Sequence, residues 1–238
     1  MNPPRTPRLL IEHEALACLM PQVQSYLLKG MALVGSTGRR VNATAAEYYA
    51  HAVFSSVSEL DAGMASLRLV RRFVDVLETH ADPDPEEYRY HYENFMIRGI
   101  GIVDRAHLLV EAALLMIRKQ GRPIDHRLIV ERVALSHPTA HAALLEVKAA
   151  VQLYRRPRNE VIHASAYSHR DLGTLCGVRV LGLELDGVDV GQLARESFAA
   201  GGQEISTALT VLAPRLDALL VALGPVFAGV MSRTQTVE

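Results

Sequence analysis

The chain has 238 residues, of which 49% are hydrophobic and 21% charged, and its formal net charge is −1. This balance excludes a disordered protein, which needs low hydrophobicity and high net charge. It also excludes a chain that binds nucleic acid through overall basicity. Two cysteines, Cys18 and Cys176, are too few for a disulfide-rich secreted scaffold. A chain of this length can bury a sizeable core, so we expect a single domain over residues 1–238.

No targeting or membrane-spanning segment is expected. The N-terminal residues 1–5 have no apolar core of a signal peptide. The longest uncharged apolar stretch, residues 218–231, has 14 residues, whereas a bilayer span needs about 20. It fits a core helix or a subunit-facing helix. We therefore expect a cytoplasmic protein without membrane contact.

Apolar residues at helical spacing predict helices through most of the chain. The predicted helices cover residues 9–34, 44–79, 84–119, 124–135, 136–154 and 191–231. Pro21 is expected to kink or divide the first, and residues 61–63 to break the second. Pro157 either kinks the helix that it follows or begins a new one at Arg158, which would extend to about residue 169.

The only convincing strand signal lies between residues 177 and 190. Residues 178–180 and 183–185 alternate in polarity around Gly182, and Asp186-Gly187 then precedes residues 188–190. Asp-Gly between alternating segments is typical of a β-hairpin. The sequence therefore predicts an all-α fold with a small β-hairpin insertion at residues 177–190.

Metal and phosphate-loop motifs are weak. His137 and His141 have the i, i+4 spacing of two helix-borne metal ligands, but Pro138 disfavours helix at His137, and no third ligand lies at a recognisable spacing. The glycine-containing loop at residues 35–40 lacks the Gly-Lys-Ser/Thr ending of a phosphate-binding loop. We therefore expect no metal and no cofactor.

Tyr88, Tyr90 and Tyr92 alternate with Arg89 and His91. Aromatic rings beside basic groups can stack on single-stranded nucleic acid. The alternative is a helix that places amphipathic tyrosines at the edge of the core.

The segment from Tyr154 to His163 is a local basic patch at a predicted helix start, and a helix N-terminus flanked by arginine attracts phosphate. Asn159 and His163 are four residues apart, so they are neighbours on one helix face, where the amide could orient the imidazole. Arg158 and His163 are five residues apart, about 140° around a straight helix. Only a long Arg side chain on an irregular first turn would reach the same cleft.

Arg158-Asn159-x-x-x-His163 resembles the Arg-x4–6-His motif of the HEPN superfamily, the higher eukaryote and prokaryote nucleotide-binding domains. In that superfamily a polar residue, often Asn, follows the Arg, and the motif begins a late core helix. The long helices predicted upstream are similar to the core pair of the family. The resemblance implies an antiparallel HEPN-like helical bundle with its core at residues 84–169. It leaves the first 80 residues and the hairpin unexplained.

The resemblance also implies a function, namely metal-independent endoribonuclease activity in a homodimer whose motif residues meet in one cleft. His163 would act as general acid or base, Arg158 would hold the scissile phosphate, and Asn159 would orient either of them. The substrate would be RNA, and Arg155, Arg156 and Arg170 are the expected further RNA-binding residues. A toxin or defence role would add an antitoxin or regulatory protein as a partner. The alternative is a non-catalytic HEPN module that binds nucleotide, RNA or a partner protein.

Overall fold

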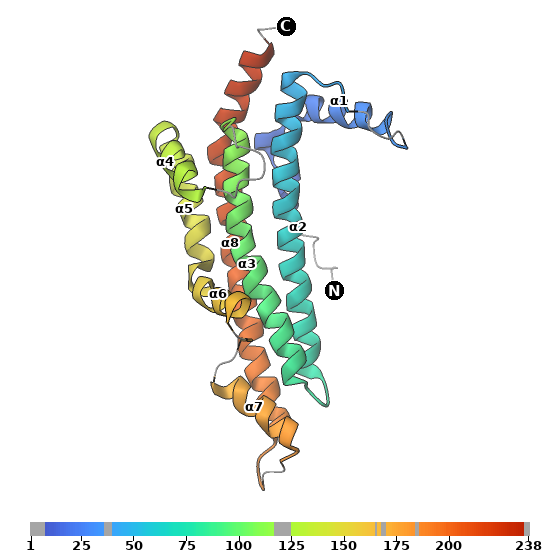
Figure 1. Cartoon of the computed structure of the whole chain (residues 1–238), viewed down its shortest axis with the longest axis vertical. Coiled ribbons are helices and arrows are strands. Elements are labelled where there is room, and N and C mark those ends of the chain that lie inside the picture. Colours follow the sequence, from blue (N-terminus) through green and yellow to red (C-terminus); the bar gives the residue numbers. More distant parts are fainter. Residues whose placement is uncertain are drawn as a thin grey trace, which may run out of the picture. The chain divides into compact units, whose positions relative to one another are not determined.

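The computed structural model describes residues 8–35, 40–116, 125–164, 166–167, 170–183 and 186–235. Within these residues all regular structure is helical, which confirms the all-α fold class (Figure 1). Three short 3-10 helices cover Leu10–Glu12, Glu14–Leu16 and Gln152–Tyr154. The α-helices are α1 (Met20–Met31), α2 (Ala45–Thr79), α3 (Pro85–Ala113), α4 (His126–Ser136), α5 (Pro138–Val151), α6 (Arg155–His163), α7 (Arg170–Leu181) and α8 (Val190–Gln235).

The helices differ from the predicted ones mainly at their breaks. The α2 helix continues through residues 61–63, and α8 continues through Pro214 and Pro225. Pro21 lies in the first turn of α1, where the missing N–H removes no intrahelical bond. The predicted loop at 36–39 lies outside the described residues. The predicted helix ends near 119 and 169 are too late, because α3 ends at Ala113 and α6 ends at His163.

The predicted β-hairpin is wrong, because its first strand is the end of α7 and no strand occurs among the described residues. Gly182 adopts a left-handed φ of 57° after α7, and the Leu183 N–H donates to the Val178 carbonyl at 3.0 Å, which is a Schellman C-cap. Asp189 caps α8, since its Oδ1 accepts the Gln192 N–H at 2.8 Å. The glycine and aspartate signals therefore mark a helix end and a helix start. Residues 184–185 lie outside the described residues.

The chain forms two compact units, and each is described here by itself. Unit 1 comprises Met1–Ala62, Val103–Val147 and Pro214–Glu238. Unit 2 comprises Gly63–Ile102 and Lys148–Ala213. The boundaries fall inside α2, α3, α5 and α8, so each unit contains a part of every one of these helices.

The apolar stretch at residues 218–231 belongs to the core of unit 1. Leu219, Leu220, Leu223 and Phe227 are fully buried, whereas Val221 is exposed. By length and composition α8 could also cross a membrane, but the core helix of a globular protein passes the same test. The sequence allowed a core helix or a subunit-facing helix here. Burial within the chain accounts for most of the apolar side chains of this stretch.

Glu47 fastens α1 to the start of α2 in unit 1. Thr44 and Glu47 form a capping box, because the Glu47 N–H donates to Thr44 Oγ1 and the Thr44 N–H donates to the Glu47 carboxylate. The same carboxylate, which is almost completely buried, accepts the Ser25 hydroxyl at 2.5 Å and Lys29 Nζ at 2.7 Å. The Lys29 hydrogen bond, followed by those from Ser25 and Thr44, lowers the pKa of Glu47 to about 2.

This lowered pKa predicts acid-sensitive stability in unit 1. An unfolded Glu has a pKa of about 4.3, so the stabilisation by ionised Glu47 is complete above that pH and is lost as the pH falls towards 2. We expect Glu47→Gln to destabilise the protein near pH 7, and the difference from wild type to shrink between pH 4.5 and 2. Urea unfolding across this range would measure it. Glu131→Gln, which breaks the exposed pair with Arg127, should show almost no difference at any pH.

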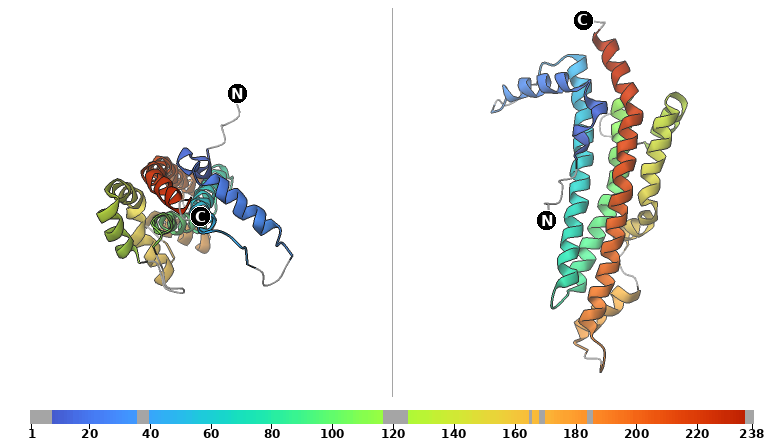
Figure 2. Two further views of the ribbon diagram at one scale, coloured as in Figure 1. Left: turned by 90° about the horizontal axis from the view of Figure 1, so that it is seen from above. Right: turned by 180° about the vertical axis from the view of Figure 1, so that it is seen from behind.

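In unit 2, α2, α3 and α8 run side by side, with α3 antiparallel to α2 (Figures 1 and 2). Arg71 of α2 donates to Ser206 of α8 and to Glu78, each at 2.8 Å. Phe73 of α2 stacks on His91 of α3, with ring centroids 4.7 Å apart. These contacts hold the three helices together beside the shorter helices α6 and α7.

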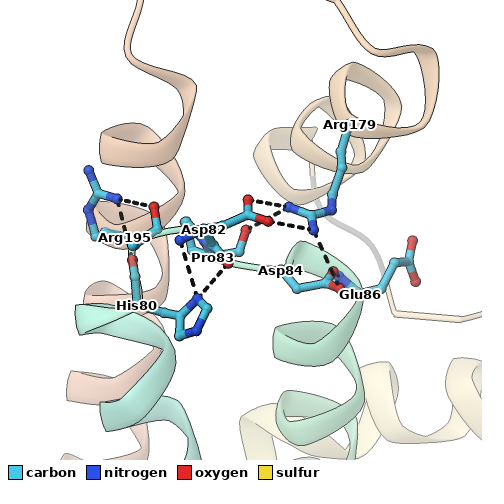
Figure 3. A network of polar contacts seen from close by, with 8 residues as sticks. His80, Asp82, Pro83, Asp84, Glu86, Arg179 and Arg195 are labelled. Carbon is cyan, nitrogen blue, oxygen red and sulfur yellow. Dashed lines mark hydrogen bonds and ion pairs between the residues drawn. The ribbon is translucent and has the colours of Figure 1, made fainter.

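The loop between α2 and α3 anchors α7 and α8 (Figure 3). Arg179 of α7 donates to both carboxylate oxygens of Asp82, at 2.8 and 3.2 Å. Arg195 of α8 donates to the carbonyls of His80 and Ala81. The Arg179 hydrogen bonds lower the pKa of Asp82. This network fixes the end of α7, whose first residue is Arg170.

Candidate functional site

The predicted motif lies on α6, a helix separate from α5 that has Pro157 in its first turn. A 3-10 helix at Gln152–Tyr154 follows α5, and α6 starts at Arg155. Pro157 is the third residue of α6, in the first turn, where its missing N–H is tolerated. The start of α6 is anchored by buried Tyr154, whose ring packs edge-on against Phe95 of α3 at 4.7 Å. Burial raises the pKa of Tyr154 to about 12, so its hydroxyl stays protonated.

Four of the six predicted site residues line one depression on α6, with a volume of about 510 Å³. They are Arg155, Arg156, Asn159 and His163, joined by Gln152, Glu160 and Ala164. Asn159 and His163 are both exposed, and the imidazole has no hydrogen-bond or ion-pair partner among the described residues. An accessible imidazole in this position can exchange a proton with a ligand.

Arg158 does not line this depression. Its Nη1 donates to Asn159 Oδ1 at 3.0 Å, and its Nε is buried without a partner among the described residues. The Asn159 amide oxygen therefore accepts from the guanidinium, and no hydrogen bond joins Asn159 to His163 in the described part of the chain. Helix geometry explains why Arg158 does not line the depression with His163, because side chains five residues apart point in directions about 140° apart.

The depression is positively charged. Arg155 has no ion pair within the described residues, and Arg156 pairs with Glu160 at 3.0 Å while its side chain is 90% exposed. An exposed pair of this kind is weak, so Arg156 remains available to an anion. With three arginines and one glutamate on α6, the surface attracts phosphate.

Arg170 lies elsewhere, at the rim of a larger cavity between α3, α7 and α8, with a volume of about 780 Å³. Tyr88 and Tyr92 form its floor, and Tyr167, Glu196 and Glu204 also line it. Sequence reasoning placed Tyr88 and Tyr92 at the core edge or in a nucleic-acid stack, and both prove to be buried. It missed Tyr167, Glu196 and Glu204, which are distant in sequence and carry no local motif.

The cavity depends on a close approach of α8 to α3 at Gly201. A Cβ at this position would overlap the Tyr88 hydroxyl and lie 2.9 Å from Tyr88 Cζ. At Gly202 it would lie 2.7 Å from Arg71 Nη1 and would overlap the Glu78 carboxylate. The two glycines thus provide the space for the Tyr88 ring and for the Arg71–Glu78 ion pair.

The histidines considered as metal ligands are in surface positions. His137 ends α4, and its Nδ1 contacts Ser136 Oγ at 2.8 Å. His141 lies one turn further, within α5. In the described part of the chain, no group of three or more His, Cys, Asp or Glu side chains is arranged to hold a metal ion.

A comparison with protein-family models matches residues 39–175 to a HEPN family described as Cthe2314-like. The match includes α6 and its motif, and it begins well before residue 84, so it also includes α2. Comparisons with curated proteins and with solved structures gave no significant match. The matched residues make up more than half of the chain. The chain, with its helical fold and its Arg158–His163 motif, belongs to the HEPN superfamily.

Proposed function

We propose that the protein is an endoribonuclease that cleaves RNA without a metal ion, with α6 at the centre of its site. HEPN domains are often associated with ribonuclease activity. The observation that carries the proposal is the accessible His163, which shares one depression with Asn159, Arg155 and Arg156. An acid–base group beside cations that attract phosphate is the pairing that phosphodiester cleavage needs.

In the proposed reaction, the ribose 2′-oxygen attacks the adjacent phosphorus and the bond to the 5′-oxygen breaks. His163 takes the proton of the 2′-hydroxyl or gives one to the leaving 5′-oxygen, and water makes the other transfer, so that no net proton is consumed. Arg155 and Arg156 bind the phosphates, and Arg170 binds RNA further from the scissile bond. The products are a 2′,3′-cyclic phosphate end and a 5′-hydroxyl end. The step is an internal transesterification of the RNA, in which one P–O bond forms and one breaks.

Arg158 enters this proposal through a second copy of the chain. Within one chain its guanidinium is bonded to Asn159, and it does not line the depression that holds His163. A homodimer that joins two α6 helices would bring the guanidinium of one subunit to the phosphate held by the other, and it would double the local positive charge. We propose this homodimer as the active form in the cytoplasm, where an antitoxin or regulatory protein would control it.

A non-catalytic binding module is the second candidate, and one contact favours it. The Arg158 guanidinium is already bonded to Asn159, and its Nε is buried. A module of this kind would bind RNA, a nucleotide or an acidic partner on the same arginines without transferring a proton. The two candidates differ in whether RNA is cleaved and not in where it binds.

The two candidates are separated by one assay of the wild-type chain. We expect mixed RNA to be cleaved in EDTA, at a rate unchanged by added Mg²⁺, with 2′,3′-cyclic phosphate at the new ends. End-labelled RNA on a denaturing gel, with and without phosphatase treatment, measures both rate and end chemistry. RNA that is bound in a gel-shift assay but remains intact would reject the nuclease and support the module.

A further inference from the structure

The cavity lined by Tyr88, Glu196 and Glu204 is separate from the depression on α6 and has its own chemistry. It lies entirely within unit 2, and its volume of about 780 Å³ falls in the range of small-molecule sites. One stripe of α8 forms a wall, with Leu193, Glu196, Ser197, Ala200, Gly201 and Glu204 at helical spacing. The first turns of α7 form another, with Arg170, Asp171 and Thr174.

A continuous stack of aromatic rings includes three that line the cavity, namely Tyr88, Tyr92 and Tyr167. Phe198 of α8 stacks on Tyr88 at 4.3 Å, Tyr88 on Tyr92 at 5.7 Å, and Tyr92 on Tyr167 at 5.0 Å. The Tyr167 N–H donates to Glu93 at 2.7 Å, which holds the last ring in place. Stacking therefore restricts the rotation of the Tyr88 and Tyr92 rings.

Tyr88 has a hydroxyl without a hydrogen-bond partner in the described part of the chain. The residue is only 2% exposed, and it lines the cavity. The Tyr88 hydroxyl is not among the enclosed unpaired atoms of the described residues, so it opens onto the cavity and can bind a ligand there. A ligand with an N–H group in the cavity would supply the missing partner.

The charge of the cavity favours a cation. Asp171, Glu196 and Glu204 face one arginine, Arg170, and none of the three carboxylates has an ion pair among the described residues. Glu204 accepts a hydrogen bond from Tyr92, and Glu196 accepts one from Gln192. Three carboxylates in the lining outnumber its single arginine, so the interior of the cavity attracts a cationic ligand.

The separation of the carboxylates favours a linear ligand with more than one charge. Glu196 and Glu204 are eight residues apart on α8, which is about 12 Å along the helix axis. A single ammonium group can contact only one of them. We propose that this cavity binds a small linear polyamine, whose ammonium groups contact Glu196 and Glu204 and whose N–H donors reach the Tyr88 hydroxyl. The proposal does not depend on the ribonuclease function.

Isothermal titration calorimetry of the full chain with spermidine tests this directly. We expect one molecule to bind per chain, and n-butylamine, with one ammonium group, to bind at least tenfold more weakly. Tyr88→Phe removes only the hydroxyl and keeps the ring stack, and Glu196→Gln removes one charge. Each variant should weaken spermidine binding about tenfold, since hydrogen bonds to charged groups are the stronger kind.

Glu87→Gln is the matched control, because Glu87 is an exposed carboxylate of α3 in the same unit but does not line the cavity. It should leave the affinity unchanged. An equal loss in Glu87→Gln would show diffuse attraction to negative charge and overturn the site. Absence of one-to-one binding, or full retention of affinity in Tyr88→Phe and Glu196→Gln, would overturn it as well. Circular dichroism and melting of each variant confirm that the fold is kept.

Discussion

Replacing His163 with alanine is expected to lower RNA cleavage by about 10²–10⁴, the usual contribution of a positioned general acid or base. The imidazole is exposed at the end of α6 and has no partner in the described part of the chain, so its loss should leave the melting temperature unchanged. Initial rates on a defined RNA, measured in EDTA for wild type and variant at matched concentration, give the ratio. The activity should fall while the binding of RNA is largely kept.

His141→Ala is the matched control, since it removes an imidazole from α5 at a position without a proposed role. It should retain wild-type activity. Equal losses in the two variants would mean that cleavage does not depend on the α6 histidine. If His163→Ala cleaves as fast as wild type, the proposed acid–base role is wrong.

The Arg158 variants separate charge from geometry in the same assay. Arg158→Ala should weaken both RNA binding and turnover, because it removes a donor that strengthens its contact as charge develops on the phosphate. Arg158→Lys keeps the charge but loses the planar fork that also contacts Asn159, so it should restore binding more than turnover. If Arg158 acts across a dimer, mixing inactive Arg158→Ala and His163→Ala chains should recover part of the activity.

Gly201→Ala is expected to destabilise the protein by about 1–3 kcal/mol, the usual effect of forcing an extra methyl group into a packed site. The new Cβ would overlap the Tyr88 hydroxyl, and the Tyr88 ring can move away only by disturbing its stacking on Phe198 and Tyr92. Chemical denaturation of the two proteins measures the difference. Gly229→Ala, on the exposed side of the same helix with no atom near its Cβ, should instead stabilise by about 0.5–1 kcal/mol.

The double variant Gly201→Ala with Tyr88→Phe tests whether overlap with the Tyr88 hydroxyl causes the destabilisation. Removing the hydroxyl relieves the worst overlap, although the ring carbon 2.9 Å away remains, so stability should recover in part. If the two effects simply add, the steric explanation fails. A Gly201→Ala protein as stable as Gly229→Ala would show that the close approach of α8 to Tyr88 does not occur.

Helix-capping residues predicted where helices begin, whereas short segments of alternating polarity predicted strands that the structure does not contain. The Asp84-Pro85 start of α3 was visible in the sequence because an N-cap side chain and a proline at the first helical position act within one turn. The hairpin failed because Gly182 and Asp189 served as a helix end and a helix start, which short alternating segments do not distinguish from a turn between strands. The capping box of Thr44 and Glu47 was found only in the structure, and it accounts for the helix start that apolar spacing predicted at residue 44.

The sequence by itself determined the helical class, the family and the basic motif of α6, because helical spacing, caps and a short motif are all encoded within a few residues. Only the tertiary structure decided that Arg158 binds Asn159 and does not line the depression that holds His163, and that residues 218–231 lie mostly in a core. It alone brought Glu204 to Tyr92, a contact between residues 112 positions apart. Such contacts depend on which helices pack together and on where Gly201 allows a close approach, and no local pattern contains that information.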